Sequence, residues 1–255
     1  GHAGEVQHTI SESYVKRLYD HGFLHLESTQ QFYDTKEDMF LNGRQVVGHC
    51  PVQGCKSEKA YADECDLGHQ YDPADLINPI SSVSGTVPEM RTVNNWYFDL
   101  PSLAYIVKDY VEAAEQDEQV RPLVPKTIKE FLVPPIIYIK VELYDAYTQI
   151  VDKLPAHEYR DAAKGKQSFE LEFASVADRD QARGVLTEAN IRFRTGKALV
   201  PFRISGNASW GIPCPEIDGV SGLSIWCWRE SLWAPLSFTM ARNDEQGLSL
   251  SLIHI

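Results

Sequence analysis

A short stretch between Cys50 and His69 constrains this chain more than any other feature. It contains three of the five cysteines. Cys50 and Cys55 form one close pair, and Cys65 and His69 form a second pair beyond a short polar loop. Zn²⁺ takes four thiolate or imidazole ligands in tetrahedral geometry, and two short hooks supply them without a large fold around them. The stretch therefore predicts a zinc knuckle with Cys50, Cys55, Cys65 and His69 as the metal ligands.

Two alternatives stay open at the level of sequence. The spacing from Cys50 to Cys55 is wider than the usual pair separated by two residues, so buried cysteines beside a surface histidine are also consistent with it. Asp66 is an alternative fourth ligand, although its position next to Cys65 leaves it little reach. An odd number of cysteines and a metal-like cluster favour a reducing, cytoplasmic compartment over a disulfide scaffold.

Composition excludes some classes of protein. The 255 residues suffice for one large domain or two small ones, and 43% of them are hydrophobic, as in a globular protein. No apolar run is long enough to span a bilayer, and the polar start does not resemble a signal peptide. The net charge of -12 argues against a broad, non-specific nucleic-acid surface.

A small basic face is compatible with this overall acidity. Arg192 and Arg194 lie on one side of an expected strand, and Lys197 and Arg203 follow. Such a face offers contacts to an RNA phosphate backbone. A solvated outer strand face is the simpler interpretation, since exposed charge on one side of a strand is common.

The first half of the chain predicts alternating helices and strands. Helices are expected at 10–21 and 103–114, with a helical turn at 72–77 that ends at Asn78-Pro79. Strands are expected at 23–33, at 46–47 leading into Cys50, and at 88–100. The segment 116–125, acidic and then bearing prolines, predicts a linker.

The second half predicts a small α+β unit with its own core. Strands or helices are expected in the order β-α-β-α-β-β, at 136–143, 144–153, 168–174, 178–189, 191–194 and 198–204. The last two strands are expected to form a hairpin through Thr195-Gly196-Lys197. Residues 248–255 alternate like a further strand.

Several motifs occur in the order found in one family. They are GHCP at 48–51, ADEC at 62–65, LINP at 76–79, WYFDLP at 96–101, WGIPCP at 210–215 and WCWRE at 226–230. With these motifs the chain closely resembles methionyl-tRNA synthetases, which are class I aminoacyl-tRNA ligases. The resemblance covers about residues 5–131 and 203–240.

The resemblance implies a domain plan and a substrate pocket. The fold class is α+β, with a zinc-binding connective-peptide domain at 1–125, an inserted α+β unit at 126–205, and a partial Rossmann catalytic segment with a strand-like tail at 206–255. Trp228 matches the tryptophan beside the methionine side chain, and Glu230 stands where an aspartate is usual. The family's later pocket tyrosine appears here as Pro235.

Departures from the family are equally specific. The HIGH-type signature and the KMSKS-type loop, which serve ATP in the family, are both absent from this sequence. The family often has four cysteines in tighter pairs, whereas here His69 replaces the last cysteine.

Two functions follow as hypotheses. The chain is either a fragment of an ATP- and Mg²⁺-dependent methionine–tRNA ligase, with methionine, ATP and the tRNA acceptor end as partners of the parent enzyme, or a non-catalytic zinc-containing binding module derived from it. In both, zinc is structural, no membrane is involved, and this chain alone is expected to be inactive.

Overall fold

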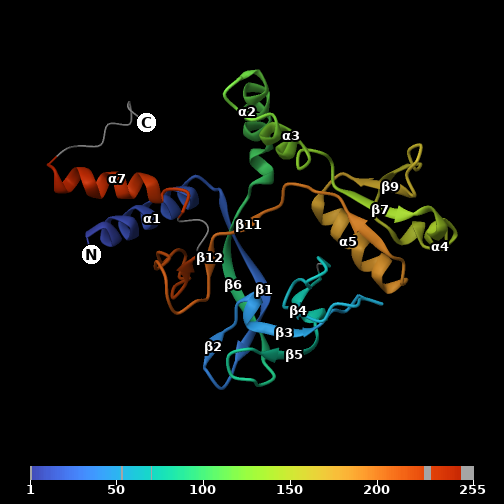
Figure 1. The fold of residues 1–255 in the computed structure, drawn as a ribbon, viewed down its shortest axis with the longest axis horizontal. Coiled ribbons are helices and arrows are strands. Elements are labelled where there is room, and N and C mark those ends of the chain that lie inside the picture. Colours follow the sequence, from blue (N-terminus) through green and yellow to red (C-terminus); the bar gives the residue numbers. More distant parts are fainter. Residues whose placement is uncertain (1, 53, 70, 227–230, 248–255) are drawn as a thin grey trace. The chain divides into compact units, whose positions relative to one another are not determined.

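The computed structural model describes residues 2–52, 54–69, 71–226 and 231–247 (Figure 1). The chain divides into two compact units. Residues 1–98 and 202–255 form the first, and residues 99–201 form the second. Both units mix helices with antiparallel sheets, so the predicted α+β class is confirmed at this level. In the described part of the chain, no helix has the length and apolar character needed to cross a membrane.

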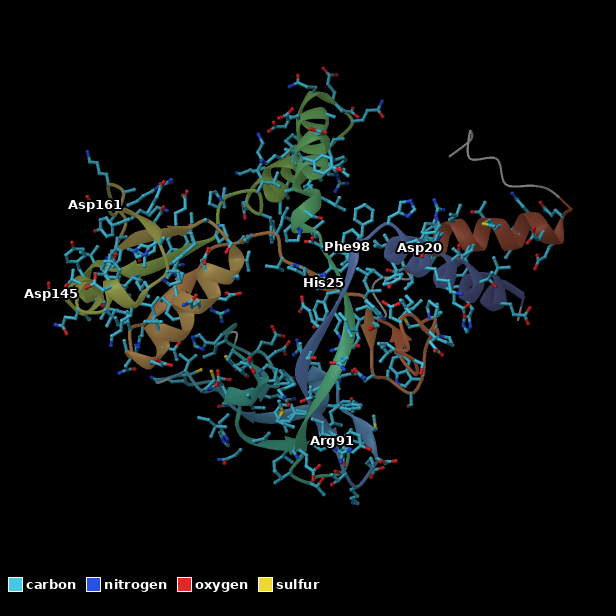
Figure 2. All side chains as sticks on the ribbon, turned by 180° about the vertical axis from the view of Figure 1, so that it is seen from behind. Asp20, His25, Arg91, Phe98, Asp145 and Asp161 are labelled. Carbon is cyan, nitrogen blue, oxygen red and sulfur yellow. The ribbon has the colours of Figure 1, made fainter. Side chains whose placement is uncertain are left out.

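A long two-stranded ribbon organises the first unit. Strands β1 (Leu24–Asp34) and β6 (Glu89–Phe98) are antiparallel and pair from Leu24 opposite Phe98 to Tyr33 opposite Glu89. In Figure 2, His25 and Phe98 mark one end of this ribbon and Arg91 marks the other. The sheet is completed at its edges by two short strands, β2 (Met39–Phe40) and β11 (Phe202–Arg203).

Each end of the ribbon belongs to a different hydrophobic core. Leu24 and Trp96 pack with Val15, Ile204 and Cys214. At the other end, Phe32 packs in a core with the small residues of the cysteine-bearing segment. The middle of β1 is polar and alternates between half-buried and exposed side chains. The ribbon therefore connects two small cores, and neither core runs along its whole length.

The first core is covered by helix α1 (His2–Asp20) and by the short pair β12 (Ser205–Gly206) and β13 (Ser224–Ile225), and helix α7 (Ala234–Glu245) packs on α1. The helix predicted at 10–21 is present but begins earlier. Ser11 is fully buried and accepts a hydrogen bond of 2.8 Å from the Trp233 indole. Gln7 is also buried and bonded to Ser237. Buried polar residues interrupt the apolar pattern at the start of α1, and their hydrogen-bond partners lie far along the chain. The sequence pattern therefore did not predict the first turns of this helix.

A second small sheet carries the cysteine hooks. It has the order β4-β3-β5, from strands β4 (Ala60–Tyr61), β3 (Val46–His49) and β5 (Ile77–Ser81). A Cβ atom on Gly48 would approach the Ile77 carbonyl oxygen to 2.7 Å, so this close strand contact requires glycine.

Two short 3₁₀ turns flank these strands, η1 (Gly43–Gln45) and η2 (Pro73–Asp75). The helical turn predicted after Asp72 is therefore present, and the Asp72 side chain accepts a hydrogen bond of 2.9 Å from the Ala74 N–H. Asn78 and Pro79 lie within β5 instead of ending a helix. Asn78 adopts φ 52°, a left-handed conformation that asparagine tolerates better than most residues.

A buried carboxylate links the ribbon to this sheet. Asp34 has no exposed surface and accepts a hydrogen bond of 2.5 Å from the Ser81 hydroxyl. The backbone N–H groups of Lys36 and Glu37 also donate to it, at 3.0 and 3.1 Å. Hydrogen bonds from Ser81, and then from Ser84, hold the pKa of Asp34 at about 2, below its ordinary 3.8.

This pKa predicts an acid-sensitive contribution to stability. Because the folded pKa is lower than the unfolded one, the contribution is present above pH 4 and is lost as pH falls through about 2. We expect the urea midpoint of Asp34→Asn to lie below that of the wild type at pH 6. The difference between the two midpoints should become smaller as pH falls toward 2. A difference in midpoints that stays constant with pH would contradict the lowered pKa of Asp34. Asp38→Asn, at an exposed turn, serves as the control.

The second unit begins with two helices. They are α2 (Ala104–Gln116), entered through the turn η3 (Pro101–Leu103), and α3 (Leu123–Lys129). The helix predicted at 103–114 is confirmed. The linker predicted at 116–125 is partly wrong, since α3 starts inside it and packs on α2. Prolines at the start of a helix are compatible with its first turn, which explains why Pro122 and Pro125 misled the prediction.

A four-stranded antiparallel sheet follows in the same unit. Its order is β10-β7-β9-β8, from β7 (Ile136–Lys140), β8 (His157–Arg160), β9 (Ser168–Phe173) and β10 (Phe193–Thr195). Helices α4 (Tyr144–Thr148) and α5 (Val176–Glu188) connect them, with short turns η4 (Val141–Leu143) and η5 (Val151–Lys153). The chain order β-α-β-β-α-β with this strand order is the split β-α-β, or ferredoxin-like, arrangement.

The predicted order β-α-β-α-β-β is therefore wrong in two places. Strand β8 was missed, because HEYR lies at a sheet edge, is largely exposed and has no apolar alternation. The hairpin predicted through Thr195-Gly196-Lys197 does not form: β10 pairs with β7 in the second unit, and β11 pairs with β6 in the first. The compact unit also begins at residue 99, ahead of the boundary expected at 126.

Candidate metal centre

The two predicted hooks leave the small sheet close together. Cys50 directly follows β3, and Cys65 is bridged to Ala60 at the start of β4. Each hook has a glycine immediately before its second ligand: Gly54, with φ 76°, precedes Cys55, and Gly68, with φ 80°, precedes His69. Because glycine adopts positive φ without steric cost, both hooks turn back on themselves within a few residues.

Backbone hydrogen bonds hold the hooks in this shape. The Cys55 N–H donates to the Val52 carbonyl at 3.0 Å, and the Gly68 N–H donates to the Cys65 carbonyl at 2.9 Å. The Cys65 N–H also donates to the His69 carbonyl at 3.0 Å. The positions of the side chains are thus set by local backbone structure.

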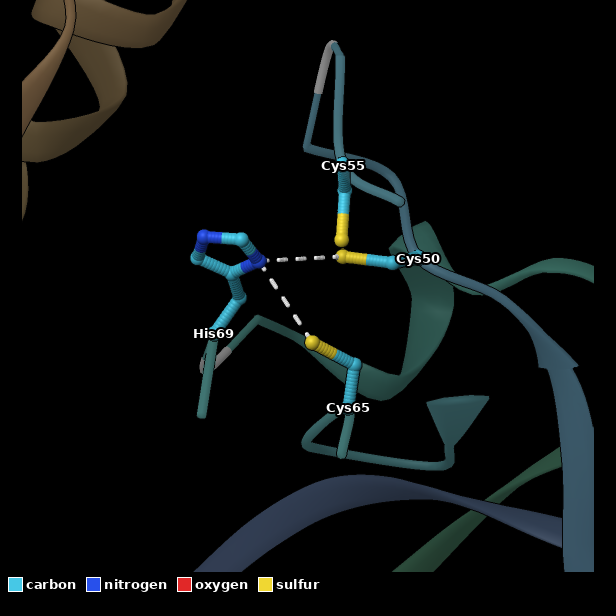
Figure 3. Close-up of side chains that lie close together, drawn as sticks. All are labelled: Cys50, Cys55, Cys65 and His69. Carbon is cyan, nitrogen blue, oxygen red and sulfur yellow. Dashed lines mark hydrogen bonds between the residues drawn. The ribbon is translucent and has the colours of Figure 1, made fainter. Parts of the chain in front are cut away.

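The four side chains converge on one point (Figure 3). One ligand atom from each of Cys50, Cys55, Cys65 and His69 lies within 4.8 Å of all the others. Nδ1 of His69 lies 3.7 Å from Sγ of Cys50 and 3.4 Å from Sγ of Cys65. A tetrahedral site with Zn–S of about 2.3 Å and Zn–N of about 2.0 Å places its ligand atoms roughly 3.5–3.8 Å apart. The chemistry and spacing of the donors therefore fit zinc.

The alternative fourth ligand, Asp66, takes another role. Its carboxylate accepts a hydrogen bond from the Ser57 hydroxyl, and its N–H donates to the Lys59 carbonyl at 3.0 Å. Asp66 is not among the four converging residues. It stabilises the loop that joins the two hooks.

Burial and neighbouring groups shift the pKa values of Cys50 and Cys65 in opposite directions. Burial, with added effect from the Cys55 and Cys65 thiols, raises the pKa of Cys50 to about 11. Burial acts in the same sense on Cys65, but hydrogen bonds from the His69 and Leu67 backbone outweigh it and lower its pKa to about 7. Thiolate is the form that binds metal, so Cys65 is more ready to do so than Cys50.

One residue at this site was not found from the sequence. Tyr71 packs partly buried against the same core and donates a hydrogen bond of 2.8 Å to the Tyr61 carbonyl. Burial, followed by the charges of Cys50 and Cys65, raises its pKa to about 12. Only its position two residues beyond His69 pointed to it.

The predicted basic face is not one surface. Arg192 and Arg194 share the outer side of the second unit's sheet, but Lys197 forms an ion pair of 2.5 Å with Glu130. Arg203 belongs to the first unit, where its guanidinium lies 4.8 Å from the Trp226 ring centre and donates to Ser205 and Asn207.

The residues proposed to contact methionine, Trp228 and Glu230, lie outside the described residues, as do 248–255. Two neighbouring tryptophans are described and have packing roles. Trp226 fills space directly against Gly206, and Trp233 stacks on Tyr14 at 5.2 Å.

Three thiols and one imidazole, held on two short hooks of an antiparallel sheet, define a protein with a Cys3His cluster that could hold a metal ion. Residues 2–142 match the family model described as tRNA synthetases class I (M). The chain belongs to this family, the class I methionyl-tRNA synthetases.

Known proteins similar to this chain agree with that family. The methionine–tRNA ligase of Korarchaeum cryptofilum is 36% identical over 132 residues, which are 51% of this chain and 23% of that ligase. The corresponding ligase of Thermofilum pendens is 36% identical over 105 residues, which are 41% of this chain and 18% of the ligase. The chain thus spans about a fifth of the length of the curated relatives it matches.

Among solved structures, Mycobacterium tuberculosis methionyl-tRNA synthetase bound by methionyl-adenylate aligns with 91% of this chain and 28% of its own. The sequence identity is 12% and the TM-score is 0.34.

Proposed function

We propose that this chain is part of a methionine–tRNA ligase and that its Cys50–His69 cluster holds a structural Zn²⁺. The observation that carries the proposal is that the family match at 2–142 includes all four converging ligands. The parent reaction is the ATP- and Mg²⁺-dependent activation of methionine, followed by transfer to tRNA.

The ligand set favours a structural role for the metal. Zinc held by four protein ligands has no open position for water or substrate, so it fixes the backbone and does no chemistry. Here it would tie the two hooks to each other and to the core around Val46 and Leu76. A connective-peptide domain stiffened in this way would support the tRNA acceptor end in the complete enzyme.

The C-terminal part would contribute to the catalytic domain. We infer that residues from 206 onward correspond to a partial Rossmann segment, in which Trp228 and Glu230 lie beside the methionine side chain. The glutamate in place of an aspartate and Pro235 in place of a tyrosine suggest a modified pocket. A cytoplasmic location fits a cluster of reduced thiols and stays a prediction.

One observation favours the alternative of a non-catalytic binding module. The chain carries an additional ferredoxin-like unit, β7 to β10 with α4 and α5, which could serve as an interaction site of such a module. The coding sequence that flanks this segment distinguishes the ligase from the binding module. HIGH-type and KMSKS-type signatures on either side of the segment would identify a ligase, and their absence there would identify a module.

We expect no methionine-dependent ATP–pyrophosphate exchange by these 255 residues alone. The physical reason is that the groups which stabilise the ATP phosphates in this family are missing from the chain, so the transition state lacks its electrostatic support. The measurement is radiolabelled pyrophosphate exchange with and without methionine, with a complete methionyl-tRNA synthetase as the positive control. Exchange above the methionine-free background would contradict the expectation.

A further inference from the structure

The sheet of the second unit has one covered and one open face. Its inner side chains pack on the helices, and Figure 1 shows α5 lying along β7 and β9. Alternation along each strand directs the intervening residues to the other side. Register places Arg194 of β10, Tyr138 of β7 and Glu170 of β9 in one row across this outer face.

This outer face is hollowed into a groove of about 880 Å³, within the size range of ligand sites. Tyr138 lines it, between Arg194 and Glu170 in the row across the sheet. Arg192 and Arg194 line one side, and Lys166, from the loop before β9, lines the other. These residues come from separate strands and loops and meet only in the folded unit.

Several cations of this unit are held in ion pairs, including Lys140 of the groove, which pairs with Glu142 at 3.4 Å. On the helix side, Arg179 and Arg183 both pair with Asp180, and on the sheet edge Arg160 pairs with Glu172 at 2.7 Å. Among the described residues, Arg192, Arg194 and Lys166 have no carboxylate within ion-pair distance. In a chain of net charge -12, a groove that gathers three cations outside ion pairs is complementary to an anion.

The aromatic ring adds a second kind of contact. Tyr138 is half-buried, and the Arg194 guanidinium lies 5.6 Å from its ring centre. A half-buried aromatic ring on the open face of an antiparallel sheet, bordered by arginine and lysine, suits a flexible strand whose bases stack while its phosphates meet the cations. Glu142 and Glu170 in the same groove leave only a modest positive excess, so the affinity rests on both contacts together.

We propose that this groove binds an unpaired nucleic-acid strand, with a base stacked on Tyr138 and phosphates on Arg192, Arg194 and Lys166. Such binding is sequence-tolerant, because every base presents a stacking face. It goes beyond the proposed ligase function and does not depend on the metal.

Fluorescence anisotropy with the full chain and a labelled, unstructured RNA of about 12 nucleotides tests this binding. Three phosphate contacts predict that log K falls with log salt concentration at a slope of about -2. The double variant Arg192→Glu/Arg194→Glu is expected to weaken binding roughly tenfold or more at low salt. The matched control is Arg121→Glu/Lys153→Glu, which reverses the same charge at exposed positions outside the groove and should leave binding nearly unchanged.

The ring is tested separately from the charges. Tyr138→Ala is expected to weaken binding roughly 5- to 100-fold with little change in the salt slope, and Tyr138→Phe should restore it. A DNA strand of the same length shows whether the groove selects RNA over DNA. Tighter binding of RNA assigns the groove to RNA, and equal binding means that it recognises the phosphates and bases that both strands share.

Four results would overturn the proposal. They are no detectable binding, equal weakening by the control pair, binding of a hairpin duplex as tight as that of the single strand, or competition by polyglutamate as effective as by RNA. The last would identify an acidic peptide as the partner. Circular dichroism of each variant verifies that it is folded.

Discussion

Replacing Cys65 with serine is expected to lower bound zinc from about one ion per chain to nearly none. A serine hydroxyl is a poor zinc ligand, and the three that remain do not close a tetrahedral site. Metal binding at such sites is coupled to folding, with apparent free energies of about 10–16 kcal/mol in small zinc-finger peptides. Because a hydrophobic core also supports this segment, we expect local unfolding of residues 40–80, with the rest of the chain intact.

Elemental analysis and hydrogen exchange measure the two parts of this expectation. Amides of the hooks and of β3 to β5 should exchange faster in Cys65→Ser and in chelator-treated wild-type protein alike. Cys214→Ser is the matched control, since Cys214 is also buried but belongs to the core around Trp96. Zinc should stay at about one ion per chain in that variant. A metal-free wild-type protein with protected hooks would refute the zinc assignment.

The candidate zinc ligands could be proposed from sequence because the hooks are local structures. Clustered cysteine and histidine residues are typical of metal binding. A glycine that allows a sharp turn stands directly before the second candidate ligand of each hook. The strand at 168–173 was equally visible, since Phe169, Leu171 and Phe173 alternate with polar residues and all three are buried. In both cases a few neighbouring residues contain the whole signal.

Features that depend on distant partners could not be predicted in this way. The start of α1 is stabilised by contacts of Gln7 and Ser11 with residues near the C-terminus. The strands at 193–195 and 202–203 are close in sequence, yet they pair in different units. The groove around Tyr138 requires residues of three strands and a loop, so sequence alone offered only the pair of arginines on one strand face.

Replacing Phe169 with alanine is expected to destabilise the second unit by about 3–5 kcal/mol, the usual cost of removing a large buried aromatic side chain. Phe169 is 1% exposed, and its ring contacts those of Tyr144, Tyr147 and Tyr159. Helix α4 has only five residues, so it depends on this packing more than on its own hydrogen bonds.

The same variant tests whether the two compact units are energetically separate. The cores around Phe169 and around Phe32 share no buried residue, so loss of the former should leave zinc content and the protection of the hooks unchanged. Hydrogen exchange resolved by peptide should then show fast exchange within 136–195 only. Leu123→Ala is the control, because Leu123 is 69% exposed in the same unit, and such surface changes usually alter stability by about 0.5 kcal/mol or less. Equal loss of protection in both units would mean that they fold as one, and the ferredoxin-like unit would then be an integral part of the zinc-bearing domain instead of an independent insertion.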